Sequence, residues 1–200
     1  MLDTIIPKIK GFLFNPVETF QNSRMDEPRA VLVYFGVLLL FYSLVNTLFY
    51  LAMRFLEFAL VFDTMRTDYL VSQLVVGPAF LFISYLIVGP VIMFILSLWV
   101  HLWVFLLGGQ KGFMKTFRAI FYSMTPHLLL GCIFIMTLFT PFWTLILMFF
   151  GIRELQEISD GRAFTVILIS MVVPVVVLIV LFIVTLLYPA MVANLVSPSP

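Results

Sequence analysis

Residues 77–107 read GPAFLFISYLIVGPVIMFILSLWVHLWVFLL, a run without a single Asp, Glu, Lys or Arg. A helix needs about 20 mostly apolar residues to cross the hydrocarbon core of a bilayer. This run is long enough to cross it with tilt. Gly77-Pro78 is typical of a helix start, and Gly89-Pro90 is typical of a kink within a helix. The stretch therefore predicts a long transmembrane helix.

The composition of the whole chain agrees with a membrane protein. Of its 200 residues, 63% are hydrophobic and 10% are charged, whereas about a quarter of the residues of a soluble domain are charged. The net charge is only +1 and Cys132 is the one cysteine. We therefore expect no nucleic-acid binding and no internal disulfide. The predicted fold class is all-α, a polytopic transmembrane helical bundle.

Clusters of charge divide the rest of the sequence into further apolar stretches. Ala30–Met53 and Ala163–Tyr188 are each long enough for one crossing. Ala119–Ile152 would extend about 50 Å as a single helix, and the sequence TLFTP at 137–141 predicts a tight turn inside it. The sequence thus predicts five spans, at about 30–53, 78–107, 119–136, 139–152 and 163–188.

Basic residues are distributed unequally between the loops of this arrangement. If the N-terminus is cytoplasmic, only Arg54 and Arg66 lie outside, as the positive-inside rule expects. The other nine of the 11 basic residues lie inside: Lys8, Lys10, Arg24, Arg29, Lys111, Lys115, Arg118, Arg153 and Arg162. We expect a multi-pass protein of the cell membrane with its N-terminus inside and its C-terminus outside. A re-entrant hairpin over Ala119–Ile152 would satisfy the same charge pattern.

The chain divides into a cytoplasmic or interfacial segment, a five-span domain and a short outside tail, at 1–29, 30–190 and 191–200. In the first segment, apolar residues recur at helical spacing between charged ones, which predicts a short amphipathic helix in the headgroup plane. Asn15, Pro16 and Glu18 follow as a helix-start signal: a cap, a proline in the first turn and a capping-box carboxylate. We interpret the segment as an interfacial anchor, with the docking of a partner as the alternative.

The loop GGQKGFMKTFR, from Gly108 to Arg118, combines glycines with cations. Its glycines allow a tight reversal of the chain. Its cations could bind anionic headgroups, each contributing on the order of 1 kcal/mol, or could simply set the topology. The residues concerned are Gly108, Gly109, Lys111, Gly112, Lys115 and Arg118.

Few polar side chains are expected at membrane depth, where ionisable residues suggest a functional site. His101 and His127 could lie at comparable depth on adjoining helices, and with Tyr122 and Pro126 they form a candidate intramembrane polar site. Because the spans offer no carboxylate away from their ends, we interpret the histidines as hydrogen-bond donors in the bundle or as interfacial residues. A proton relay is the alternative.

The familiar catalytic motifs are missing from the sequence. The sequence has no HExxH, no GxSxG, no pair of intramembrane aspartates and no ligand set for zinc or iron. We therefore expect no enzymatic activity, no cofactor and no metal.

A series of short motifs is spread over most of the chain. It comprises Phe14-Asn15-Pro16, Leu107-Gly108-Gly109, Gly112-Phe113, Thr116-Phe117-Arg118, Tyr122-Ser123, Pro126, Gly151-Ile152-Arg153-Glu154 and Arg162-Ala163. From about Phe14 to Leu187 the chain resembles the Yip domain family, named after Ypt/Rab-interacting proteins. The resemblance implies a five-span fold with a cytoplasmic N-terminus.

Eukaryotic members of that family act in vesicle traffic, where they bind Rab-type GTPases and one another. Here the segment before the first span is much shorter than theirs, so the chain is similar to a compact prokaryotic member. Rab binding is therefore not expected to carry over.

Taken together, these patterns favour a non-enzymatic membrane protein that organises or binds other membrane components. The expected partners are the lipid bilayer, anionic lipids in it, other membrane proteins and a second copy of the chain. The competing hypothesis is a small transporter or channel, with a re-entrant hairpin around Thr137–Pro141 and His127 as its polar element. A membrane enzyme comes third.

Overall fold

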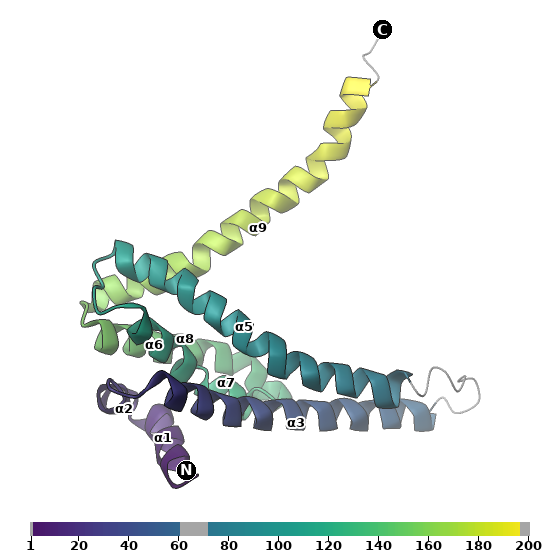
Figure 1. Cartoon of the computed structure of the whole chain (residues 1–200). Coiled ribbons are helices and arrows are strands. Elements are labelled where there is room, and N and C mark those ends of the chain that lie inside the picture. The colour runs from purple at the N-terminus through teal and green to yellow at the C-terminus, as the bar shows by residue number, and fades with distance from the viewer. Residues whose placement is uncertain (1, 61–71, 197–200) are drawn as a thin grey trace.

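The computed structural model describes residues 2–60 and 72–196, and within them the side chains of 4–60 and 72–185. All regular structure in this described part is helical (Figure 1). The elements are α1 (Leu2–Phe14), α2 (Pro16–Asn22), α3 (Pro28–Leu60), the π-helix η1 (Ser72–Val76), α5 (Gly77–Leu106), α6 (Phe113–Ser123), α7 (Thr125–Leu130), α8 (Phe134–Gln156) and α9 (Asp160–Val196).

Four helical stretches of the described part are long and apolar enough to cross a membrane: Pro28–Leu60, Ser72–Leu106, Phe134–Gln156 and Asp160–Thr185. α5 continues unbroken through Pro90, as expected for a proline that kinks a membrane helix without ending it. Large apolar side chains lie exposed along α3, α5, α8 and α9. Exposed apolar area of this extent marks contact with a membrane or a partner, and together with the four apolar helices of membrane-spanning length it identifies the chain as a membrane protein.

The expected third span, 119–136, is not one helix. Its residues are divided among α6, α7 and the beginning of α8. α6 and α7 meet at Met124, and Pro126 lies in the first turn of α7, where its missing N–H leaves no hydrogen bond unmade. Neither α6 nor α7 is long enough to cross alone.

The turn expected at 137–141 was placed wrongly. Thr137 and Pro141 both lie inside α8, and the chain reverses instead at 131–133, between α7 and α8. A Cβ on Gly131 would lie 2.4 Å from the carbonyl oxygen of His127, so glycine permits the close approach that the reversal needs. The proline signal was misleading because a membrane helix can continue through a proline.

The core is concentrated at the end of the bundle where the N-terminal helices lie. There Phe12 of α1 stacks on Tyr122 of α6 with ring centroids 4.7 Å apart and meets Phe20 of α2 at 4.8 Å. Tyr34 of α3 meets Tyr122 edge-on at 5.2 Å. Each of these four rings is almost fully buried, so α1 and α2 are packed parts of the fold.

The long helices run in alternating directions between the two ends of the bundle. α3 leads away from the N-terminal end, α5 returns beside it, and α8 returns again to the same end (Figure 1). α9 starts there, packs against α5 and α8, and then diverges from the other helices.

Candidate functional site

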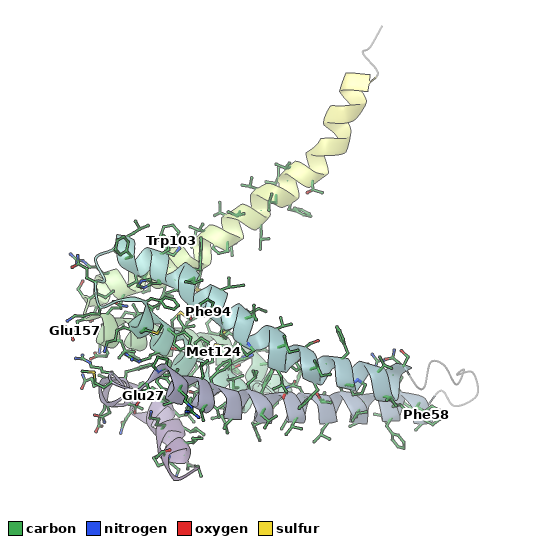
Figure 2. All side chains as sticks on the ribbon, in the orientation of Figure 1. Glu27, Phe58, Phe94, Trp103, Met124 and Glu157 are labelled. Carbon is green, nitrogen blue, oxygen red and sulfur yellow. The ribbon has the colours of Figure 1, made fainter. Side chains whose placement is uncertain are left out.

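Three segments far apart in the sequence meet at the end of the bundle where Glu157 is labelled in Figure 2. They are the N-terminal segment up to α3, the loop between α5 and α6 with the first turns of α6, and the turn between α8 and α9. We call their shared cluster of hydrogen-bonded polar side chains the polar end, and it is made up of Lys8, Gln21, Arg24, Asp26, Lys111, Lys115, Arg118, Tyr122, Glu154, Gln156 and Glu157.

Two of the expected loop cations bind one backbone carbonyl. Lys115 Nζ donates to the carbonyl oxygen of Arg24 at 2.7 Å, and Arg118 Nη1 donates to the same oxygen at 2.9 Å. Residues three apart lie on one face of a helix, so α6 brings both cations to this acceptor. Positive charge is therefore concentrated at this point.

The third loop cation, Lys111, is paired with a carboxylate. Lys111 Nζ lies 2.5 Å from Glu157 Oε2, and Arg24 Nη1 lies 3.1 Å from Glu157 Oε1. The neighbouring Lys111 ammonium lowers the pKa of the Glu157 carboxyl. Glu157 ends α8 with a φ of 53°, a left-handed conformation that glycine normally occupies. A glutamate at this position adds ion pairs that glycine could not.

The side chain of Gln156 holds the loop in place. It is 2% exposed. Its Oε1 accepts a hydrogen bond from the backbone N–H of Lys111 at 3.1 Å, while its Nε2 donates to the carbonyl of Gly112 at 3.0 Å and to Thr116 Oγ1 at 2.9 Å. One amide thus joins the end of α8 to both the loop and α6.

The glycines of the loop have the role that the sequence predicted for them. Gly108 and Gly112 have φ values of +93° and +87°, which side chains disfavour. A Cβ on Gly109 would lie 2.4 Å from Val104 Cγ1. The tight reversal depends on these three positions.

A second group of hydrogen bonds joins α1 to the loop between α2 and α3. Lys8 Nζ and the Tyr122 hydroxyl both donate to Asp26 Oδ2, and Lys8 Nζ lies 3.2 Å from the Tyr122 oxygen. No sequence pattern marks Lys8 or Asp26 as a site residue. They are 18 positions apart, and Tyr122 lies 96 positions beyond Asp26, so no local pattern links them.

The helix start predicted at Asn15, Pro16 and Glu18 is partly confirmed. Pro16 occupies the first position of α2, and Glu18 lies in its first turn. Asn15 makes no side-chain capping bond. Its backbone carbonyl instead accepts a hydrogen bond from Thr19 Oγ1 at 2.7 Å.

The four residues of the candidate intramembrane site lie in separate surroundings. His101 Nδ1 is 2.9 Å from Thr116 Oγ1, which connects it to Gln156. His127 Nδ1 is 3.2 Å from Thr140 Oγ1, and its ring lies 5.5 Å from that of Tyr42. Tyr122 belongs to the polar end, and Pro126 is buried at the start of α7. Each histidine has a threonine partner, in agreement with the hydrogen-bonding interpretation.

No three His, Cys, Asp or Glu side chains of the described residues are grouped as ligands for a metal ion. The polar end can act electrostatically, because it holds ammonium, guanidinium and carboxylate groups in fixed positions at one end of an apolar bundle.

An all-helical bundle with apolar outer surfaces and a charged end defines a polytopic membrane protein. The sequence model of the Yip1 domain matches residues 10–193, and the chain therefore belongs to the Yip1 domain family. No curated protein and no solved structure matches it.

Proposed function

We propose that this protein acts without catalysis as an organiser of the membrane, and that its polar end binds anionic lipid headgroups. The observation that carries the proposal is the pair Lys115 and Arg118. Both donate to the uncharged carbonyl of Arg24, and among the described residues neither forms a salt bridge, in contrast to Lys111. Their charges are therefore available to a phosphate, which is a strong acceptor for ammonium and guanidinium groups.

The position of this pair also suits a headgroup. A cluster of cations beside the cytoplasmic end of membrane helices attracts anionic lipids. In the topology that we propose, the N-terminus is cytoplasmic, the protein lies in the cell membrane, and α6 with α7 provides the central one of five crossings. The three segments rich in basic residues then share the cytoplasmic side, and their contacts at the polar end support this arrangement.

Native mass spectrometry of the detergent-purified protein, after equilibration with phosphatidylglycerol or phosphatidylcholine, tests the proposal. We expect Lys115→Gln/Arg118→Gln to retain several-fold less phosphatidylglycerol than the wild type, with little change for phosphatidylcholine. Lys10→Gln/Arg29→Gln is the matched control, because it removes two exposed cations near the same end. The charge-retaining variant Arg118→Lys should keep most of the binding.

Equal retention of phosphatidylglycerol by the wild type and Lys115→Gln/Arg118→Gln would refute the proposal. A solute flux in liposomes that is lost on His127→Ala would favour the transporter hypothesis instead. A protein partner that crosslinks reproducibly, and is lost in the same double variant, would point to protein docking at this surface.

A further inference from the structure

A second site lies inside the bundle, away from the polar end. A cavity of about 340 Å³ lies between α5, α7, α8 and α9. Its lining includes Met93, Met124, His127, Thr144 and Ser170, and Met124 is labelled in Figure 2 among the packed helices. The volume falls within the range of pockets that hold small molecules.

Two hydroxyl groups in this cavity have no hydrogen-bond partner among the residues that the structure describes. Thr144 Oγ1 and Ser170 Oγ are both buried and unpaired. Serines in a helix usually donate to the carbonyl one turn earlier. The buried Ser97 does so to Met93 at 2.8 Å, and Ser123 does so to Ala119 at 2.5 Å. Thr144 and Ser170 do not make this bond. Both hydroxyls can therefore form a hydrogen bond with a molecule in the cavity.

The walls favour an uncharged molecule. Four methionines, Met93, Met124, Met148 and Met171, contribute flexible apolar surface that adapts to an irregular chain. The described lining residues include no Asp, Glu, Lys or Arg, so a charged group would be buried without a counter-ion, which is strongly unfavourable.

The depth of the hydroxyls excludes an ordinary phospholipid headgroup. At a rise of 1.5 Å per residue, Ser170 lies about 15 Å along α9 from Asp160, and Thr144 lies about 18 Å along α8 from Gln156. The hydrocarbon core is about 30 Å thick, so both hydroxyls lie near its middle. Pro141 and Met171, at the edge of the cavity, are exposed on the outer surface of the bundle, and a molecule can enter from the bilayer.

We propose that this cavity is a binding site for a single-chain amphiphile with a small, uncharged, hydrogen-bonding head, of the class of long-chain alcohols. The head group binds Thr144 Oγ1 and Ser170 Oγ, and the chain extends along the methionine walls toward the bilayer.

Photolabelling tests this inference with the full-length protein in phosphatidylcholine liposomes. The probe is a diazirine-bearing dodecanol, and the labelled residues are identified by peptide mass spectrometry. We expect label on the cavity methionines. Excess dodecanol should compete for it, whereas dodecane, which has the same chain length and no hydroxyl, should not.

Substitutions separate recognition by the hydroxyls from simple access to the cavity. Thr144→Val/Ser170→Ala should reduce labelling of the cavity at least fivefold, and Ser170→Leu should abolish it by filling the space. Thr47→Val is the control, because Thr47 Oγ1 is also buried with no partner among the described residues but does not line this cavity. This variant should label like the wild type. The double variant should unfold at the wild-type temperature or above it, because it removes two unpaired buried hydroxyls.

Two results would overturn the inference. One is equal cavity labelling in the wild type and in a folded Thr144→Val/Ser170→Ala protein, or equal competition by dodecane. The other is label confined to the lipid-exposed outer surface of the helices. Because this site shares no residue with Lys115 and Arg118, neither result bears on headgroup binding at the polar end.

Discussion

Single side chains connect the separate segments of the polar end, and Gln156 is the clearest case. It satisfies one backbone N–H, one backbone carbonyl and one hydroxyl in a buried position. A glutamine near the end of an apolar helix gives no local sign of this role, because its partners lie 40 or more residues earlier in the chain.

Replacing this amide should therefore weaken the fold. We expect Gln156→Leu to lower the free energy of unfolding by about 2 kcal/mol, because it leaves buried polar groups of the loop without partners. Unfolding by SDS in mixed micelles measures the difference. Gln110→Leu, an exposed position in the same loop, is the control and should change little; a comparable loss in both variants would contradict the assigned role.

At the scale of the element, Phe12 is the aromatic side chain that packs the N-terminal helix α1 into the bundle, in addition to the ion pair between Lys8 and Asp26. Phe12 is fully buried among rings from α2, α3 and α6, whereas Phe14 in the same helix is 75% exposed. We expect Phe12→Ala to remove about 3–5 kcal/mol of packing, and so to release α1 to proteolysis. Limited digestion of proteoliposomes, compared with Phe14→Ala, checks this; equal cleavage rates would show that α1 is held in another way.

The packing of α8 against α2 and α6 depends on close approach at Gly151. A Cβ there would lie 2.8 Å from the Phe20 ring and 3.1 Å from Ala119 Cβ. We expect Gly151→Ala to destabilise the protein by about 1–3 kcal/mol through overpacking. At Gly36 of α3 the corresponding space is open, and Gly36→Ala should be neutral or stabilising by up to about 1 kcal/mol. Melting temperatures of the two variants should therefore shift in opposite directions, or only that of Gly151→Ala should fall.

For the whole molecule, the pair α6 and α7 determines the number of membrane crossings. Together they span residues 113–130, about 27 Å if aligned, which is close to the thickness of the hydrocarbon core. We propose a full crossing, with the reversal at 131–133 near the outer surface.

Cysteine labelling distinguishes a crossing from a re-entrant hairpin. In a Cys132→Ala background, we expect Ile133→Cys to react with a membrane-impermeant maleimide added outside intact cells. Gln110→Cys, at the polar end, should react only after the cells are opened. Protection of Ile133→Cys from the outer reagent would support a re-entrant hairpin.

Much of the architecture was predictable, because membrane helices are specified by local composition. The apolar run at 77–107 forms α5, as predicted, and the spans predicted at 30–53 and 163–188 lie within α3 and α9. The glycine-rich reversal before α6 and the family resemblance were confirmed as well. The turn at 137–141 was wrong because proline can be accommodated inside a membrane helix, and local sequence alone does not show whether it is.

The amino-acid sequence by itself determined the class of protein, the family and the position of most membrane helices, since a long apolar run without charge is stable as a helix in hydrocarbon whatever surrounds it. Only the tertiary structure decided which partners the polar side chains have. In the tertiary structure, Lys115 and Arg118 bind the carbonyl of Arg24, and Lys111 pairs with Glu157. Lys8 and Tyr122 both bind Asp26. Within the described part of the chain, the tertiary structure also left the hydroxyls of Thr144 and Ser170 unpaired around a cavity. Hydrogen bonds and ion pairs depend on distances of about 3 Å between atoms, and only the packing of distant segments sets these distances.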